Sequence, residues 1–534
     1  MLNSKNIKKN YSKYFVNLFL LIYIIFGLYY STQTGISYDE FGEQYNWQIN
    51  IEAVKGLFVG DQKYYNELLN YPPKYYGIGF HFISQVYINL FKFILLLENF
   101  SLETTKILIN HSLIFIFFFI SGLYSKKIID LSIKNNFFSN LFLFFYLLYP
   151  YLLGHGFYNS KDTPFLTLWI MCTYFSLKIF LNINSKKKIK YREIIILSFL
   201  TAYLLSIRIS GIMIFIQYLS GFLILVNLGN NMAVTILKEN FIKIILFFTI
   251  LILLTYAFYP VFWKNPFLIV EAINQMKAYP QGVCTLTFGK CMKAVNLPSS
   301  YIFLWLSFKL PILTLLGIAI LIFSEKKIFI DNNQKIIVGS ILVSIISIIF
   351  LLIFFDVNLY DELRQILFLI PLIIIIAFIS LYVFSKKILI IFSALTIFIF
   401  IIQNILIYPY QYGWFNSFSL FTNLNSKFEL DYWGVGGRNI ANKINNSKQI
   451  LEIKNKCIYA APEHLLKPFL NEEFACVKPL KSIYPSSKEK YILAKFTRTL
   501  RRDNPSNCLL VINESYNILP FSEKLNTGEV FICN

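Results

Sequence analysis

Charged residues are scarce in this sequence, and acidic residues are the scarcest. Only 15% of its 534 residues are charged, with 29 Asp and Glu against 49 Lys and Arg. Hydrophobic residues make up 56%, whereas a soluble globular protein is about 45–50% apolar. This composition excludes a soluble protein and predicts a polytopic membrane protein. The net charge of +20 does not indicate nucleic-acid binding, because no basic patch lies on a polar domain large enough to use it.

Three other features are missing. No small-x-small cleavage site follows the first apolar run, which ends at Tyr29-Tyr30-Ser31, so we expect an uncleaved membrane anchor rather than a signal peptide. No Cys-x-x-Cys motif occurs, which argues against a zinc ribbon. No clear internal repeat is present, which weakens the case for an inverted-repeat transporter.

The cysteines lie mainly outside the apolar segments. Cys172 is in an apolar run and is expected to serve in packing. The others form two groups in polar stretches, Cys284 with Cys291 in one loop, and Cys457, Cys476, Cys508 and Cys533 near the C-terminus. This grouping predicts two sets of disulfides in an oxidising compartment. The sequence does not choose among the three possible pairings of the last four.

Apolar runs of helix length predict about eleven membrane crossings. They cover residues 14–30, 107–124, 141–153, 165–181, 194–207, 212–226, 241–258, 301–323, 336–355, 366–384 and 388–407. The positive-inside rule places the N-terminus and the lysine-rich loops 125–136 and 183–192 in the cytoplasm. The N-terminus and loop 125–136 lie on the same side only if an even number of crossings separates them. Phe80–Leu97 must therefore be re-entrant or lie along the outer surface. Residues Phe41 to Phe58 have the pattern of an amphipathic helix in the interface.

The composition changes near residue 423, where apolar runs shorten to strand length. We therefore expect residues 1–422 to form a transmembrane domain, with 31–105 as a first outer loop that carries interfacial helices. Residues 423–534 are expected to form a small periplasmic α/β domain braced by disulfides, with a short helix at Pro462–Leu470. The predicted fold class is thus mainly α, with a small C-terminal α/β extracytoplasmic domain.

Ionisable residues in three predicted outer loops are candidates for chemistry, since charges beside a membrane are costly and often functional. The loops contain Asp39 and Glu40, then His155, Lys161 and Asp162, and finally Asp361 and Arg364. A carboxylate can act as a general base or bind a divalent cation, and Lys and Arg side chains can bind a phosphodiester. The plainer explanation is interfacial groups solvated by water and lipid head groups. Arg208, between the apolar runs 194–207 and 212–226, is a further candidate for binding phosphate. Snorkelling of its side chain to the membrane interface explains its presence equally well.

In their order along the chain, these motifs resemble the GT-C class of membrane glycosyltransferases. The greatest resemblance is to bacterial members of glycosyltransferase family 39, the protein O-mannosyltransferase and aminoarabinose transferase group. The motifs are Asp39-Glu40, Tyr71-Pro72-Pro73 before a surface helix, Asn159-Ser160-Lys161-Asp162-Thr163-Pro164, and Tyr360-Asp361-x-x-Arg364. Tyr408-Pro409-Tyr410-Gln411-Tyr412 and Asp431-Tyr432-Trp433-Gly434 are also similar, without an assigned chemical role. The sequence departs from the usual pattern at Ser160, where Pro is more usual, and at Gln365, where His is expected.

The resemblance implies inverting transfer of a sugar from a polyprenyl-phosphate donor to an acceptor at the outer face of the membrane. Asp39 would be the general base, and Glu40 and Asp162 would orient the acceptor or bind a divalent cation, Mg or Mn. The donor phosphate would be held by Lys161, Arg208 and Arg364. Further candidates for contact with substrate or metal are His155, Tyr71 and Lys74.

The expected partners are the lipid-linked sugar, the bilayer, and a protein, lipid or polysaccharide acceptor. The expected location is a bacterial inner membrane, with the N-terminus cytoplasmic and the C-terminal domain periplasmic. Two other functions stay open, namely a transporter or flippase of lipid-linked sugars and a non-catalytic membrane scaffold.

Overall fold

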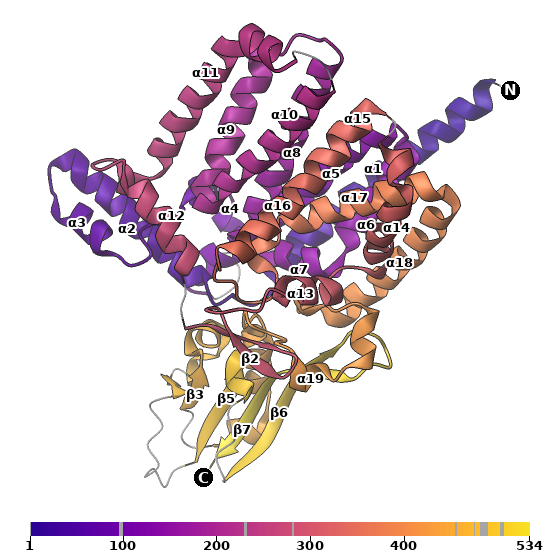
Figure 1. Ribbon diagram of the computed structural model, residues 1–534. Helices are drawn as coiled ribbons and strands as arrows, with labels where there is room; N and C mark the ends of the chain where they lie inside the picture. Colours follow the sequence, from indigo (N-terminus) through magenta and orange to yellow (C-terminus); the bar gives the residue numbers. More distant parts are fainter. Residues whose placement is uncertain are drawn as a thin grey trace.

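The computed structural model describes residues 2–95, 100–228, 232–279, 282–329, 331–453, 457–474, 476–480, 490–501 and 507–533. The chain forms a large bundle of helices with a smaller β-sheet at one end, made by the C-terminal residues and drawn in yellow in Figure 1. The predicted class, a mainly helical membrane protein with a small C-terminal sheet region, is confirmed.

Seven helices in the described part of the chain are long and apolar enough to cross a membrane, or up to nine if two bent pairs each form one span. The bundle contains α1 (Leu2–Thr32), α5 (Leu102–Ile133), α6 (Asn136–Leu148), α7 (Pro150–Tyr158), α8 (Asp162–Asn184), α9 (Tyr191–Ile207), α10 (Ile214–Asn227), α11 (Met232–Phe258), α13 (Tyr301–Lys309), α14 (Ile312–Ile328), α15 (Asn332–Gln334), α16 (Ser340–Phe354), α17 (Leu369–Phe384) and α18 (Lys386–Ile407). All eleven predicted apolar segments lie mainly in these helices. The segments in α9 and α17, with 17 and 16 residues, are not among the candidate spans.

Two of the predicted crossings are bent at prolines. α6 and α7 meet at 61° beside Pro150, and α13 and α14 meet at 119° beside Pro311. A proline has no N–H to donate and disfavours helical geometry in the residue before it, so each first helix stops there. The single continuous segment predicted for 301–323 is therefore corrected to two helices. The turn between them leaves Lys309 fully buried at the end of α13.

The predicted first outer loop forms α2 (Glu40–Val59), α3 (Lys63–Asn70) and α4 (Gly79–Leu95). In Figure 1, α2 and α3 project from one side of the bundle, near α12 (Leu268–Ala278). Side chains that include Tyr65, Phe262 and Ala272 join these helices in a small apolar core of their own. α4 has 17 residues and is not among the candidate spans. The last two residues of the predicted segment Phe80–Leu97 lie outside the described residues.

The C-terminal sheet has five strands in the order β4-β3-β5-β7-β6. They are β3 (Ile458–Ala461), β4 (Val477–Pro479), β5 (Tyr491–Phe496), β6 (Cys508–Asn517) and β7 (Lys524–Cys533). β3 is parallel to β4 and β5, whereas β7 is antiparallel to β5 and β6. The amphipathic helix α20 (Gly437–Asn445) buries Ile440 and Ile444 in the core of this region. The predicted domain boundary at residue 423 stays a prediction.

Short elements connect the two parts. A hairpin of β1 (Cys284–Thr287) and β2 (Lys290–Lys293) lies between α12 and α13, and α19 (Leu424–Lys427) and α21 (Lys448–Leu451) flank α20.

Disulfides join Cys284 to Cys291, Cys457 to Cys476 and Cys508 to Cys533, and Cys172 is a free, buried cysteine. The helix expected at Pro462–Leu470 is instead two 3-10 turns, Glu463–Leu465 and Lys467–Phe469. Pro468 explains this, since it cannot donate the hydrogen bond that would continue a helix.

Candidate active site

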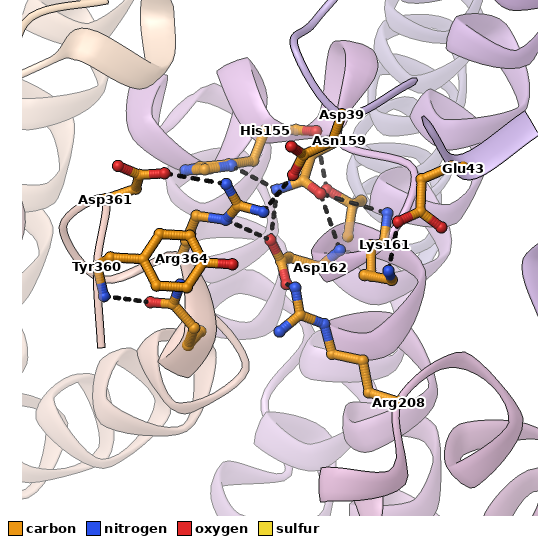
Figure 2. A network of polar contacts seen from close by, with 12 residues as sticks. Asp39, Glu43, His155, Asn159, Lys161, Asp162, Arg208, Tyr360, Asp361 and Arg364 are labelled. Carbon is orange, nitrogen blue, oxygen red and sulfur yellow. Dashed lines mark hydrogen bonds and ion pairs between the residues drawn. The ribbon is translucent and has the colours of Figure 1, made fainter. Parts of the chain in front are cut away.

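Four segments distant in the sequence bring charged side chains together between the helix bundle and the C-terminal region (Figure 2). Asp39 is the N-cap of α2, and Asp162 is the first residue of α8. Arg208 directly follows α9, and Arg364 lies in the loop between α16 and α17. Helix dipoles favour an anion at a helix N-terminus and a cation at a C-terminus, so the helix ends suit the charges of Asp162 and Arg208.

Arg364 is the centre of this cluster. Its Nη2 lies 2.5 Å from Oδ2 of Asp39, its Nη1 3.1 Å from Oδ2 of Asp361, and its Nε 3.6 Å from Oδ2 of Asp162. Figure 2 shows the guanidinium between these three carboxylates. The Arg364 side chain is only 5% exposed, so the three carboxylates replace the water that would otherwise solvate its charge.

Asp162 links Arg364 to a second arginine. Its Oδ1 lies 2.5 Å from Nη2 of Arg208, and its Oδ2 accepts a hydrogen bond of 3.0 Å from the Asn159 side-chain amide. The neighbouring Lys161 forms an ion pair with Glu43 of α2 and lies 3.7 Å above the ring centre of Tyr76. The loop that contains Lys161 and the helix α2 that contains Glu43 are thus joined through charged groups.

The environment of Asp39 keeps its carboxylate ionised. Burial acts to raise the pKa of Asp39, but the charge and hydrogen bond of Arg364, with the charges of Lys161 and Arg208, outweigh it and lower the pKa below its usual value. While Arg364 remains bound, Asp39 is therefore a weak base. A group that drew Arg364 away would raise the pKa of Asp39 and make it a stronger one.

Two cavities meet at this cluster. The outer cavity, of about 310 Å³, is lined by Asp39, Glu43, Arg364 and several aromatic side chains. The second cavity, of about 220 Å³, is mostly apolar and contains Arg208 in its wall. Three tyrosines belong to the walls of both cavities, namely Tyr76, Tyr279 and Tyr360. The polar outer cavity therefore adjoins the apolar cavity at these side chains.

The motif Asp431-Tyr432-Trp433-Gly434 acquires a structural role here. Asp431 accepts hydrogen bonds from the Tyr412 hydroxyl and from the backbone N–H of Gly434 at 2.7 Å. Gly434 has a φ of +74°, which favours glycine, so the chain turns sharply after Trp433. The turn places the Trp433 ring against Arg364, with Cζ 4.2 Å from the ring centre.

Several predicted site residues make other contacts. Glu40 is buried against His111 of α5, with Oε1 2.8 Å from Nε2. His155 is buried, and its Nδ1 lies 2.9 Å from the Asn159 amide, so it supports the loop of Asp162. The Lys74 ammonium donates to the Leu69 carbonyl. Tyr71 lines the outer cavity.

Two charged residues in the site were not predicted from the sequence. Glu43 lines the outer cavity, and its position four residues after Asp39 could have revealed it, because residues i and i+4 share a helix face. Arg498 reaches Asp361 from the C-terminal region. The sequence offers no local signal for that contact, since the two residues are 137 positions apart.

Among the described residues, no group of three or more His, Cys, Asp or Glu side chains could hold the predicted divalent cation. Glu40 and Asp162, the two carboxylates expected to bind it, pair with His111 and with Arg208 and Arg364 instead. The two arginines thus occupy positions beside Asp162 that a bound cation would take. A requirement for Mg or Mn stays a prediction, and we derive no step through a metal.

Comparison with known proteins yields only distant similarity. No protein-family model matches the sequence, and no curated protein does. Among solved structures, the chain is similar to ArnT from Cupriavidus metallidurans bound to undecaprenyl phosphate, with 10% identity, a TM-score of 0.45, and coverage of 97% of this chain and 98% of that one. It is also similar to the same protein in the apo state, with 10% identity, a TM-score of 0.40, and coverage of 85% and 87%.

Proposed function

We propose that this membrane protein transfers a sugar from a polyprenyl-phosphate donor to an acceptor at the non-cytoplasmic face of the membrane, with Asp39 as the general base. The observation that carries the proposal is the meeting of a polar and an apolar cavity at one cluster of carboxylates and guanidinium groups. A polyprenyl-phosphate sugar has the same division into an apolar chain, a phosphate and a polar ring.

The donor would lie across the boundary between the cavities. Its apolar chain would occupy the cavity that contains Arg208, and its sugar would face Asp39 in the outer cavity. Arg208 and Arg364 lie on opposite sides of Asp162, so both could bind a phosphate there, as could Lys161 after it leaves Glu43. Guanidinium groups suit phosphate because they donate parallel hydrogen bonds to it.

Arrival of the phosphate would also prepare the base. A phosphate oxygen would compete for the Nη2 of Arg364, which is bound to Asp39 in the structure. Loss of that partner would raise the pKa of Asp39 and free its oxygen for an acceptor hydroxyl. The site would thus be a poor base without donor and a better one with it, which would limit wasteful activation of water.

The chemical step would be a single displacement at the anomeric carbon. Asp39 would take the proton of the acceptor hydroxyl as its oxygen forms the new bond to carbon. The bond between that carbon and the phosphate oxygen would break, and polyprenyl phosphate would leave with the electron pair. Fixed cations would stabilise the charge that develops on the leaving group, with Arg364 closest to the base. Attack opposite the leaving group inverts the configuration.

The test is direct. Protein purified in lipid nanodiscs would be incubated with a panel of labelled polyprenyl-phosphate sugars and a membrane extract that supplies acceptors, and transfer of the label from the phosphate would be followed. Asp39→Asn should lower turnover by a factor of about 10² or more while leaving folding near normal, because it keeps the shape and removes the charge. Asp61→Asn, at an exposed position of the same loop, is the matched control. Turnover like that of wild type in Asp39→Asn would reject the base.

The same purified protein, reconstituted in liposomes, separates the rival functions. A flippase in liposomes would move labelled lipid without cleaving the sugar–phosphate bond. A scaffold would bind no donor, and its behaviour would be insensitive to changes at Asp39, Asp162 and Arg364. The panel would identify the sugar, and the labelled product would identify the acceptor.

A further inference from the structure

The C-terminal region reaches the candidate active site through Arg498. This residue lies in the 3-10 turn Thr497–Arg501, which directly follows β5. Its guanidinium forms an ion pair with Asp361 and lines the outer cavity. The Arg498 side chain is 34% exposed, whereas Asp361 is 5% exposed, so the arginine covers the carboxylate from the outer side.

Asp361 stands between two guanidinium groups. Its Oδ1 binds Arg498, and its Oδ2 lies 3.1 Å from Nη1 of Arg364. A chain of ion pairs therefore runs from Arg498 through Asp361 and Arg364 to Asp39. Any change in how Asp361 is neutralised must alter the forces on Arg364.

The backbone around Asp361 is strained. Asp361 and Glu362 have φ values of +54° and +64°, in the left-handed region that is unfavourable for residues other than glycine. Two bonds hold the backbone in place, from the Asp361 N–H to the Thr285 hydroxyl at 2.8 Å and from the Glu362 N–H to the Tyr301 hydroxyl at 3.2 Å. The Glu362 carboxylate pairs with Lys309 at 2.9 Å, and both side chains are fully buried. The backbone of Asp361 and Glu362 and the Glu362 side chain are thus held by the hairpin and the bundle. The Asp361 side chain, in contrast, is oriented by Arg364 and Arg498.

We infer that Arg498 is a positioning residue for the proposed sugar transfer: by neutralising Asp361, it leaves Arg364 aimed at Asp39 and at the donor phosphate. The inference rests on the proposed function. Without the Arg498 charge, Asp361 would be a buried carboxylate that depends on Arg364 alone. The cost of an uncompensated buried charge is large, so Arg364 would turn toward Asp361 and away from both Asp39 and the donor phosphate. The leaving phosphate would then lose a stabilising charge, which would lower turnover.

Arg501 provides a matched control in the same turn. It pairs with Glu429, its Nη1 lies 3.8 Å from the sulfur of Cys284, and its side chain is 28% exposed. Arg501 therefore docks the turn on the hairpin region as Arg498 docks it on the loop. If the turn served only to hold the C-terminal region in place, loss of either arginine would have the same effect.

The experiment compares Arg498→Gln, Arg498→Lys and Arg501→Gln in full-length protein in nanodiscs, with the donor that wild type turns over. We expect Arg498→Gln to lower kcat about tenfold or more with a smaller change in KM, Arg498→Lys to recover most of the loss, and Arg501→Gln to stay within about twofold of wild type. Equal losses in Arg498→Gln and Arg501→Gln, or no recovery with lysine, would overturn the inference.

A structural readout keeps this test independent of turnover. In a cryo-EM structure of Arg498→Gln, we expect the Arg364 guanidinium to have left Asp39 for Asp361. An Arg364 that still contacts Asp39 as in wild type would overturn the inference. If wild type releases no polyprenyl phosphate from any donor, the proposed function fails, and the position of Arg364 in Arg498→Gln still decides whether Arg498 positions it.

Discussion

At the candidate site, four carboxylates meet four cations among the described residues. Asp39, Glu43, Asp162 and Asp361 pair with Lys161, Arg208, Arg364 and Arg498. The formal charges cancel before any substrate arrives. Under the proposed function a phosphate adds negative charge to a balanced set, so a cation that binds it must loosen its hold on a carboxylate. Arg364, which holds three carboxylates, can release Asp39 and keep the other two.

A pH-dependent contribution to stability is expected from Asp431. Burial raises the pKa of this carboxyl to about 6, against hydrogen bonds from Tyr412, Gly434 and Gly436 that act in the opposite direction. The folded state therefore holds the proton more tightly than the unfolded chain, where the pKa of Asp is about 3.9. The resulting stabilisation is complete below about pH 4 and is lost as the pH rises through about 6, by up to about 3 kcal/mol.

Thermal unfolding measured between about pH 4 and pH 7 tests this expectation. In Asp431→Asn, the midpoint of thermal unfolding should fall less than in wild type as the pH rises, because an amide does not titrate. Asp61→Asn, at an exposed position, should keep the wild-type profile. Parallel profiles for wild type and Asp431→Asn would show that Asp431 does not titrate in this range.

At the scale of the helix, the start of α2 separates two neighbouring acids. Asp39 and Glu43 are four residues apart and both face the outer cavity, whereas Glu40 is turned about 100° around the axis, toward His111 of α5. The proximity of Asp39 and Glu40 in the sequence suggested a shared role. Helix periodicity sends them in different directions.

The two glutamates should therefore respond differently to amide substitution. Glu43→Gln should lower turnover about tenfold or more, since Lys161 loses its partner beside the substrate. Glu40→Gln should mainly reduce stability, by about 1–3 kcal/mol, because His111 keeps a buried and weaker partner. Turnover and the midpoint of denaturant unfolding would be measured for both variants. A catalytic defect confined to Glu40→Gln would restore the role that the sequence suggested for it.

The order of the apolar segments could be read from the sequence because hydrophobicity is a local signal, whereas the side on which the polar loops lie, inferred from lysine placement, stays a prediction. The contact between Asp39 and Arg364 joins residues 325 positions apart, and only their shared loop placement indicated it. Strand ends were harder to predict. The apolar run Cys508–Ile512 covers only the first half of β6, which continues to Asn517, because its later residues alternate between buried and more exposed positions and form no apolar run.

At the scale of the whole molecule, the proposed function requires the site and the lysine-rich loop 183–192 to lie on opposite sides of the membrane. α8 begins at Asp162 in the site and runs for 23 residues to Asn184. At about 1.5 Å per residue it is roughly 35 Å long, slightly more than the hydrocarbon thickness of about 30 Å. If α8 crosses the bilayer, Lys187 must lie on the face opposite to Asp162.

Cysteine labelling in intact cells tests this orientation, and the native background should be low, since six cysteines form disulfides and Cys172 is buried. A membrane-impermeant maleimide should label Lys63→Cys, at an exposed position in α3 of the first outer loop, without permeabilisation. Lys187→Cys, also at an exposed position, should react only after the membrane is opened. The reverse pattern would place Asp39 and Asp162 at the cytoplasmic face. The donor sugar would then have to be presented on that side, and the positive-inside argument that ordered all the loops would be wrong for this chain.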